Sequence, residues 1–484
     1  MNLREAKIAD FWRRVFKRNF DVYIEHITLE GEHIFSEFDA AFIKGIVCIV
    51  GKNGIGKSNF IRAIYNVFHT ESSNRELFKI PIINNGQISL KVQNHGVSEN
   101  YHTNIGSNIE QSEDSITSFI FDPCNTIPTL QDLISSQNNF EELLESYNTI
   151  EMSEDDISII NYLTNSQYRK IELTIIEDGF SGFSSFPFFK VINDNIVYDV
   201  RTMGLGEFSL FYFYWLIEYI RQHEGDKILL IEEPESFLPP SSQVKFANIL
   251  AKFISEVGVT CIISSHSEHI LKRIPRENIL IFRKEQNKIR CKQASDKYEF
   301  FKIIGLNAPK IGILLFEDSA AILFFKALIK HSKEHVADSF YFHISGSDGD
   351  IVNDLNRIPS KIDTFRILGI FDGDCRHNQL GLGLKSICTF LPSEKSPERL
   401  LIDFIGGISP NELALMLNKT EEEINYAFRE TLGCDHHDYF EIISKELDLD
   451  YNFIVTSMFD KWINTDDNSM IVNEFITEFG EKIK

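Results

Sequence analysis

The feature that most constrains the fold of this chain is the segment at residues 51–58, where Gly-Lys-Asn-Gly-Ile-Gly-Lys-Ser fits the pattern GxxxxGK[ST]. The apolar run at residues 46–50 is typical of a buried strand, and residues 59–69 have the apolar spacing of a helix. Glycines between a strand and a helix let backbone N–H groups curl around phosphate, and the helix N-terminus adds a favourable dipole. The segment therefore predicts a phosphate-binding loop in an α/β domain.

The residues of this loop have separate expected tasks. Asn53, Gly54 and Gly56 are expected to bring backbone groups to the phosphates of ATP. Lys57 is expected to pair with the β and γ phosphates, and the hydroxyl of Ser58 is expected to bind Mg2+. ATP and Mg2+ are therefore the ligands predicted for the first half of the chain.

Farther along the chain, a predicted strand ends in two carboxylates. Residues 228–231 are fully apolar, like a strand buried in a parallel sheet, and Glu232 and Glu233 follow them directly. Side chains at this position reach the edge of the sheet where ligands bind. Glu232 is expected to hold Mg2+ through water, and Glu233 to position and polarise the attacking water.

Two further segments flank this strand in the sequence. Upstream, Gly204, Gly206 and Glu207 belong to a Met-Gly-Leu-Gly-Glu segment that opens a predicted apolar helix. Downstream, His266 follows two serines at the end of the strand predicted at residues 259–264. Each segment alone is a weak signal, but their order and spacing after the phosphate-binding loop indicate one class of ATPase.

In this order the segments resemble the ABC-type heads of the RecF/SMC and OLD-like group, in which Glu-Glu-Pro-Glu and a following proline recur, here with Glu235 and Pro240. The resemblance assigns the ABC signature and the switch histidine to the matching residues Gly204, Gly206, Glu207 and His266. It implies a homodimer or higher homo-oligomer, in which the signature of one subunit contacts the ATP held by the other. Gly204 stands where a serine is usual, which removes one donor to the γ-phosphate and implies slow hydrolysis.

The second half of the chain carries a separate group of acids. Residues 313–316 and 367–371 are predicted strands; Glu317 follows the first, and Asp372 and Asp374 follow the second. The carboxyl ends of parallel strands converge on one sheet edge, and two aspartates spaced two apart on extended backbone can point the same way. Such a cluster of carboxylates is energetically unfavourable unless divalent cations neutralise it. Mg2+ or Mn2+ is therefore the expected bound ion.

This pattern resembles a Toprim domain, the metal-binding fold of topoisomerases, primases and OLD-family nucleases, over about residues 310–405. An ABC head followed by a Toprim domain is the arrangement of the OLD family. The resemblance implies a two-metal site for phosphodiester cleavage. Its expected ligands are Glu317, Asp372 and Asp374, with Asp348 or Asp350 and Glu398 as additions.

One position departs from the pattern of the family. Nucleases of this kind often carry an acid four residues after the first glutamate, and here that residue is Ala321. Asp318 is one substitute for the missing acid. A degenerate Toprim domain without a working metal site, and an unrelated α/β domain with solvent-facing acids, are the alternatives.

Length, cysteine content and net charge restrict the compartment and the partners expected for this protein. Its 484 residues allow two ordinary domains, and seven scattered cysteines without a CxxC pair favour a reducing cytoplasm over a disulfide framework. No apolar run approaches the roughly 20 residues of a membrane-spanning helix, and the N-terminus lacks an apolar signal region. A cytoplasmic protein without membrane contact is expected. The net charge of −23 would repel a polyanion at long range, so DNA contact would need local basic patches.

The expected organisation is an ABC-type ATPase domain at residues 1–300, a Toprim-like domain at 305–408 and a helical C-terminal region at 409–484. Residues 70–165 are rich in Asn, Ser and Glu, with helical apolar spacing only at 130–147. They are expected to form an inserted helical arm, a candidate for dimerisation.

Three polar segments leave alternatives open. Residues 3–18 predict a basic amphipathic helix, for which a solvated face is the simplest interpretation. The basic residues between 272 and 292 either contact a DNA backbone or line a solvated hairpin edge. Residues 434–438, Cys-Asp-His-His-Asp, are expected to form a polar loop rather than a metal site, because adjacent histidines point apart and no partner cluster is evident.

Three functional hypotheses follow from these patterns. The first is an ATP-regulated, metal-dependent DNA endonuclease of the OLD type, which the resemblance links to antiphage defence in Gabija-like and retron-associated systems. The second is an ATPase sensor or scaffold with an inert Toprim-like half, which recruits or restrains a separate nuclease, toxin or retron component; Ala321 favours it. The third is a RecF-like clamp for DNA maintenance, which binds DNA without cutting it.

Overall fold

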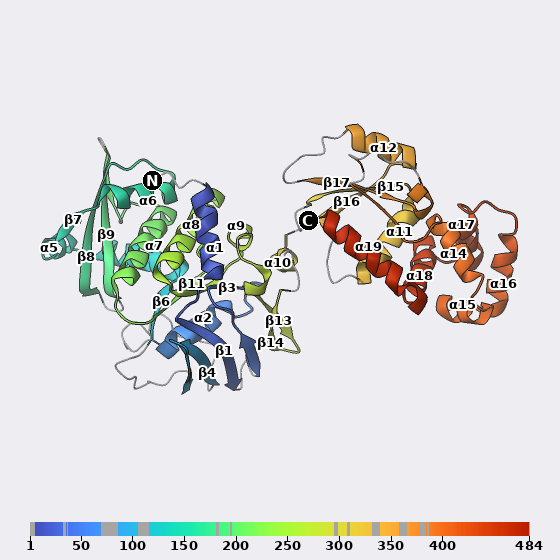
Figure 1. Cartoon of the computed structure of the whole chain (residues 1–484). Coiled ribbons are helices and arrows are strands. Elements are labelled where there is room, and N and C mark those ends of the chain that lie inside the picture. The colour runs from blue at the N-terminus through green and yellow to red at the C-terminus, as the bar shows by residue number, and fades with distance from the viewer. Residues whose placement is uncertain are drawn as a thin grey trace. The chain divides into compact units, whose positions relative to one another are not determined.

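The computed structural model describes residues 5–31, 35, 37–68, 86–104, 116–180, 183–193, 196–294, 299–306, 310–331, 339–357, 365–377, 384 and 387–483 (Figure 1). The chain forms two compact units, Met1–Leu306 and Asn307–Lys484. The end expected for the first domain, near residue 300, lies close to this division.

The centre of the first unit is a six-stranded sheet in the order β14-β13-β3-β12-β11-β6. Its strands are β3 (Ile46–Gly51), β6 (Thr117–Phe121), β11 (Lys227–Glu232), β12 (Thr260–Ser264), β13 (Ile279–Glu285) and β14 (Lys288–Gln293). Only β14 is antiparallel to its neighbour. Every residue of β3 and β12 is buried, as expected for central strands of a parallel sheet covered on both faces. This arrangement agrees with the predicted α/β class.

Alternate residues of the central strands face opposite layers, because side chains along a strand alternate between the two faces of a sheet. Cys48 and Val50 belong to one hydrophobic cluster, whereas Val47 and Ile49 belong to another. The first cluster lies under α1 (Glu5–Lys17), α4 (Pro123–Ser136), α6 (Glu154–Thr164), α7 (Leu205–Gln222) and α8 (Pro240–Val257). The second lies under α2 (Lys57–Phe68) and β1 (Val22–Gly31). Smaller helices of this unit are α5 (Phe140–Glu145), α9 (Glu268–Leu271), η1 (Arg276–Asn278) and α10 (Glu299–Ile303).

Two antiparallel sheets complete the first unit. One has the order β2-β1-β4-β5, with β1 (Val22–Gly31), β2 (Phe38–Ala41), β4 (Gly86–Asn94) and β5 (Val97–Asn104). The other has the order β10-β9-β8-β7, with β7 (Thr149–Glu151), β8 (Lys170–Phe180), β9 (Phe183–Asn193) and β10 (Ile196–Asp199).

The described part of residues 70–165 contains the helices α4, α5 and α6, but the prediction of an inserted helical arm is wrong for its strands. Strand β4 pairs with β1, and β6 pairs in parallel with β11, so both are integral to sheets of the first unit. The burial of β4 alternates along the strand, which is the pattern of a half-buried strand that its polar composition hid. Residues 69–85 and 105–115 lie outside the described residues.

The second unit is built on a fully parallel sheet in the order β16-β15-β17-β18. Its strands are β15 (Gly312–Phe316), β16 (Phe340–Ile344), β17 (Arg366–Phe371) and β18 (Cys388–Phe390). Helix α12 (Asp348–Arg357) packs on one face through Ile351 and Leu355, whereas α11 (Ser319–His331) packs on the other with the C-terminal helices.

Residues 397–482 of the second unit are mostly helical (Figure 1), and their buried side chains share a core with α11. The helices in this stretch are α14 (Pro397–Ile405), α15 (Pro410–Leu417), α16 (Glu421–Glu430), α17 (Tyr439–Leu447), α18 (Tyr451–Ile463), η4 (Asp466–Asn468) and α19 (Ser469–Lys482). Within the described ranges no single helix is long and apolar enough to cross a membrane; α14 and α15, bent by 120°, meet that test only as a pair.

Candidate functional site

The phosphate-binding loop connects β3 to α2 in the first unit. Gly54 and Gly56 have φ angles of +74° and +101°, in the left-handed region that favours glycine. A Cβ atom at Gly56 would lie 3.0 Å from the ring of Phe35, so this position also requires a small residue. Asn53 and Gly54 are exposed, whereas Lys57 is buried at the first residue of α2. The backbone at Asn53 and Gly54 is therefore exposed next to a helix N-terminus, whereas the amide of Ile55 donates to the carbonyl of Lys52 at 3.3 Å.

Lys57 is the buried cation of this loop, with 4% of the side chain exposed. Its Nζ donates a hydrogen bond of 3.3 Å to the carbonyl of Gly51 and lies 3.7 Å from Oε1 of Glu233. Burial lowers the pKa of Lys57, and the neighbouring carboxylates of Glu233, Glu235 and Glu232 oppose that effect. The lysine is thus held next to the carboxylates by the fold, where it can pair with phosphate.

Glu232 ends β11 and is 7% exposed. Burial and the nearby Asp122 raise its pKa to about 7, against a lowering hydrogen bond with Ser58. Among the described atoms, its Oε2 has no hydrogen-bond partner, although Nε of Arg62 lies 3.6 Å from it. A buried carboxylate oxygen without a donor beside a serine hydroxyl fits a hard divalent cation such as Mg2+.

Glu233 and His266 meet across the ends of β11 and β12. Nε2 of His266 lies 3.5 Å from Oε1 of Glu233, an ion-pair distance rather than a well-formed hydrogen bond. His266 and Lys57 lower the pKa of Glu233 although burial opposes them. Glu233 has a φ of +41°, and its amide donates to the carbonyl of Ser264 at 3.0 Å. The carboxylate is therefore ionised and held by the backbone next to the phosphate-binding loop.

Glu235 fixes the segment that carries His266. Its carboxylate accepts hydrogen bonds from the hydroxyl of Ser265 at 2.9 Å and from the amide of His266 at 2.5 Å. Sequence reasoning noted Glu235 only through a resemblance, and the structure gives it a positioning role. These two hydrogen bonds orient the segment that carries the histidine.

Two residues of this site were missed from the sequence. Asp122 follows β6, the strand beside β11, and its Oδ2 accepts a 3.0 Å hydrogen bond from Arg62 of α2. Nε of Arg62 also lies 3.6 Å from Glu232. The sequence contained a signal, because Asp122 directly follows a five-residue strand, and Glu232 is the last residue of the neighbouring strand. The polar surroundings of that strand concealed it.

Gly204, Gly206 and Glu207 lie at the start of α7. Gly204 is the exposed N-cap residue, and a Cβ atom added there would meet nothing within 4 Å. A Cβ atom at Gly206 would lie 2.3 Å from the carbonyl oxygen of Phe237. Among the described residues, no hydrogen bond or ion pair connects this helix start with the phosphate-binding loop. The structure therefore does not bring these residues together with Lys57 in one chain.

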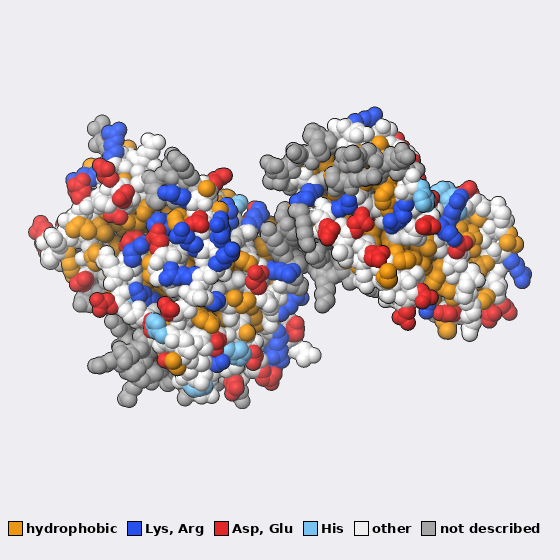
Figure 2. All heavy atoms as spheres, viewed as in Figure 1, with side chains coloured by type: hydrophobic (Ala, Val, Ile, Leu, Met, Phe, Trp, Pro, Cys, Tyr) orange, Lys and Arg blue, Asp and Glu red, His pale blue; other side chains and the backbone are white. Residues whose placement is uncertain are grey.

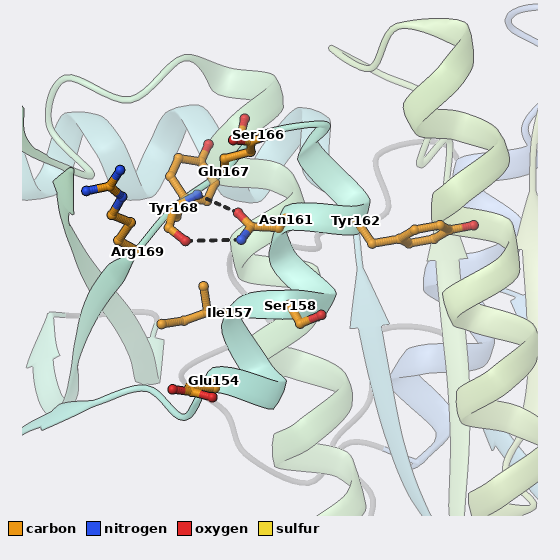
Figure 3. A pocket seen from close by; sticks show the side chains of 9 residues that line it. All are labelled: Glu154, Ile157, Ser158, Asn161, Tyr162, Ser166, Gln167, Tyr168 and Arg169. Atoms are coloured by element: carbon orange, nitrogen blue, oxygen red, sulfur yellow. Dashed lines mark hydrogen bonds between the residues drawn. The ribbon is translucent and has the colours of Figure 1, made fainter. Parts of the chain in front are cut away.

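The carboxylate of Glu207 has partners of its own. It accepts hydrogen bonds from the phenols of Tyr168 at 2.7 Å and Tyr198 at 2.5 Å. Tyr168 also lines a surface hollow of about 480 Å³ beside α6 (Figure 3), where its backbone pairs with the side chain of Asn161. The predicted contact of Glu207 with the nucleotide stays a prediction; within this chain its carboxylate connects α7 to Tyr168 and Tyr198.

The predicted acids of the second unit gather at the carboxyl ends of β15 and β17. Asp372 is 3% exposed, and its Oδ1 has no hydrogen-bond partner in the described part of the chain. Burial, followed by the charges of Asp318 and Glu317, raises the pKa of Asp372 to about 9. Burial also raises the pKa of Glu317, helped by Asp318, Asp348 and Asp374. The structure thus brings Glu317, Asp372 and Asp374 into one acidic group whose unpartnered oxygen fits a divalent cation.

The departure at Ala321 has a local explanation. Ala321 is fully buried, and its amide donates a 2.8 Å hydrogen bond to Oδ1 of Asp318. Asp318 therefore serves the first turn of α11 while it lies close enough to raise the pKa of Asp372. A longer side chain at residue 321 would enter the core rather than the acidic group.

The prediction that the two histidines of residues 434–438 point apart without a partner is wrong. The rings of His436 and His437 are 3.9 Å apart, and Nδ1 of His437 lies 3.4 Å from Oε1 of Glu398. Glu398, at the start of α14, is 4% exposed. The loop before α17 folds back onto the acidic group, a contact that no local pattern encodes.

The basic residues between 272 and 292 support the hairpin-edge interpretation. Most of those on the hairpin lie on β13 and β14, at the edge of the central sheet. Lys288 and Arg290 pair with Glu37, and Arg283 and Lys292 pair with Glu299. On the face seen in Figure 2, basic side chains gather instead over α1 and α8. Two glutamates of the same chain thus pair with four basic residues of the hairpin.

Comparison with known proteins gives a family match within the first unit. Residues 46–272 match the family described as "AAA domain, putative AbiEii toxin, Type IV TA system". The protein "DNA replication and repair protein RecF" of Bifidobacterium longum subsp. infantis is 31% identical over 72 residues, which cover 15% of this chain and 17% of RecF. This chain thus spans about a sixth of that relative's length. Residues 46–272 therefore form an ATPase domain of the AAA type.

Solved structures similar to the chain include SMC heads. The Thermotoga maritima SMC head domain is 14% identical, with a TM-score of 0.32, over 56% of this chain and 98% of the head. The Pyrococcus yayanosii Smc head domain with a coiled coil and joint is 10% identical, with a TM-score of 0.38, over 59% of this chain and 99% of that chain. An SmcHead bound to the C-winged helix domain of ScpA is 14% identical, with a TM-score of 0.36, over 56% of this chain and 97% of that head.

Proposed function

We propose that this protein is a dimeric ATPase that hydrolyses ATP to regulate a metal-dependent DNA endonuclease site in its own second unit, in defence against phage. The observation that carries the proposal is the buried acidic group at the ends of β15 and β17, in a chain whose first unit contains an ATPase domain. The defence role rests on the OLD-like order of the two domains.

In the proposed ATPase site, amides of Asn53, Gly54 and Gly56 receive the phosphates, and Lys57 pairs with the β and γ phosphates. Mg2+, held by Ser58 and through water by Glu232, would neutralise phosphate charge when bound. Glu233 orients the attacking water, which agrees with its ionised carboxylate. His266 holds that carboxylate from the neighbouring strand end.

A dimeric arrangement is supported by the start of α7. The first amides of a helix lack partners within it and attract anions. Gly204 is exposed there and makes no described bond to the phosphate-binding loop of its own chain. The ATP on a second copy is the anion that we propose for this helix start, with the amides of Leu205 and Gly206 as donors.

In the proposed nuclease site, Glu317, Asp372 and Asp374 hold Mg2+ or Mn2+. Bound cations would stabilise the charge that develops on a phosphodiester during hydrolysis. The chain itself contributes the buried carboxylates, and their mutual repulsion favours cation binding. DNA is the proposed substrate.

The ATPase half is tested by phosphate release and by ATP binding. Lys57→Ala is expected to abolish ATP binding, whereas Glu233→Gln is expected to keep it and to slow hydrolysis about 10²–10⁴-fold. Light scattering of the Glu233→Gln variant with ATP is expected to give the molar mass of a dimer. Equal hydrolysis by the wild type and Glu233→Gln would refute the assigned role.

The nuclease half is tested by nicking of supercoiled plasmid in Mg2+ or Mn2+, with and without ATP. The wild type is expected to nick, and the double variant Asp372→Ala/Asp374→Ala is expected to lose the activity. If both proteins cut at the same background level, the nuclease proposal fails.

Two observations favour a second candidate, an ATPase sensor or scaffold with an inert second unit. Ala321 replaces an acid of the resembled family, and the matching family is described as a putative toxin of a type IV toxin–antitoxin system. This candidate predicts co-purification with a neighbouring gene product in fixed stoichiometry and no intrinsic cleavage.

The short RecF match favours a third candidate, an ATPase of DNA maintenance. It predicts DNA binding that depends on ATP, without cutting and without a protein partner. This candidate assigns no function to the buried acidic group of the second unit.

A further inference from the structure

Beside the acids at the ends of β15 and β17 lies a cluster of two carboxylates and one histidine. One ligand atom each from Asp318, Glu398 and His437 lies within 4.8 Å of the others. The three residues come from separate places: the end of β15, the first turn of α14 and the loop before α17. The fold, rather than one stretch of sequence, assembles this group.

Glu398 gives this group a second, independent mark of a ligand site. Its side chain is 5% exposed, and its Oε2 has no hydrogen-bond partner among the described atoms. A buried carboxylate oxygen without a donor is energetically unfavourable, and a bound cation removes that penalty. Only the other oxygen, Oε1, faces His437, at 3.4 Å.

We propose that Asp318, Glu398 and His437 form a metal position of their own, which takes a transition-metal ion such as Zn2+ or Mn2+ in preference to Mg2+. Carboxylates alone suit Mg2+, whereas an imidazole ligand shifts preference toward Zn2+ and its neighbours. The inference deepens the proposed nuclease function, on whose metal-dependent site it rests.

Asp318 can serve both the helix and the metal. Its Oδ1 accepts the amide of Ala321 at 2.8 Å. A carboxylate offers two oxygens with about four acceptor sites, so this bond leaves capacity for a cation. Asp318 also lies near Asp372, whose pKa it raises, so the position adjoins the acids at the strand ends.

His437 is a better ligand candidate than its neighbour. Asp435, His436 and His437 also form a close group, but all three lie in one loop. His436 pairs with Asp435 at 3.0 Å, whereas His437 reaches the buried Glu398. The proposal therefore assigns the metal to His437 and leaves His436 as a matched control in the same loop.

The test is direct metal binding to the full chain, without ATP or DNA. After removal of metals with EDTA, Zn2+ and Mg2+ are each titrated by calorimetry into wild type, His437→Ala, His436→Ala and Glu398→Gln. His437→Ala and Glu398→Gln are expected to weaken one Zn2+ site about tenfold or more. Mg2+ binding by His437→Ala and Zn2+ binding by His436→Ala are expected to match the wild type. Circular dichroism checks that each variant is folded.

Three results would overturn the proposal: equal Zn2+ affinity and stoichiometry in wild type and His437→Ala, an equal loss in His436→Ala, or an equal loss of Mg2+ binding. The experiment separates this inference from the nuclease proposal, because it needs no cleavage. A chain that never nicks DNA but loses Zn2+ with His437→Ala would refute the nuclease and keep the metal position.

Discussion

Asp372 carries the clearest electrostatic consequence of any single residue in the second unit. Burial and the adjacent Asp318 and Glu317 raise its pKa from 3.8 to about 9. A folded protein that binds a proton more tightly than the unfolded chain loses stability as pH rises. The penalty begins above the unfolded pKa and grows until pH passes about 9. Asp372→Asn cannot ionise, so we expect it to be more stable than the wild type in EDTA, by a margin that grows with pH.

Thermal unfolding at pH 5.5 and pH 8 measures this margin. Each kcal/mol is worth roughly 2–4 °C for a domain of this size. Asp467→Asn, at an exposed aspartate of the same unit, is the control and should give no pH-dependent difference. A margin for Asp372→Asn that stays flat or shrinks toward pH 8 would contradict the assigned burial cost.

At the residue scale, the sequence predicted the side chains that follow strands and missed those that meet through tertiary contacts. Glu232 and Asp372 end apolar strands, which is a local pattern. Arg62 bonds to Asp122 across 60 residues, and His437 meets Glu398 across 39. No spacing rule encodes such contacts, because they depend on how α2 and α14 pack.

The start of α7 offers a prediction at the scale of one element. Gly206→Ala places a Cβ atom 2.3 Å from the backbone oxygen of Phe237, which cannot move away like a side chain. We expect a loss of about 1–3 kcal/mol, as for other overpacked positions. Gly204→Ser meets nothing within 4 Å, and serine suits an N-cap position. Its stability is expected to change by only a few tenths of a kcal/mol.

Chemical denaturation of both variants, with phosphate release alongside, checks this pair. Gly204→Ser restores the hydroxyl usual in ABC signatures, so faster ATP turnover is expected from it if α7 contacts the ATP of a second copy. Gly206→Ala should lower turnover as the helix start shifts. Equal denaturation midpoints for Gly206→Ala and the wild type would show that this close approach is not required.

At the same scale, apolar strands and long helices were predictable, whereas half-buried strands were not. The central strands β3, β11 and β12 are continuous apolar runs. Strand β4 alternates buried with exposed residues in a segment rich in polar side chains. Its pairing with β1 closes a sheet across about sixty residues of sequence, a contact set by topology rather than by composition.

At the scale of the whole molecule, each hydrophobic cluster lies within one of the two units. Two clusters draw every described member from residues up to 301, and two draw every member from residue 314 onward. Each unit therefore has a core of its own, the usual mark of a domain that can unfold independently. A single two-state transition is not expected for such a chain.

Scanning calorimetry of the full chain should accordingly show two transitions with separate ligand responses. Anything that binds only the folded state stabilises it, by about 2.7 kcal/mol at a hundredfold excess over Kd. ATP with Mg2+ should raise the transition of the first unit, which contains the ATPase domain. Mn2+ without ATP should raise the transition of the second unit, where the acidic group lies. Lys57→Ala should remove the first response alone, and Asp372→Ala the second alone; one transition that both ligands shift equally would instead mean that the units unfold as one body.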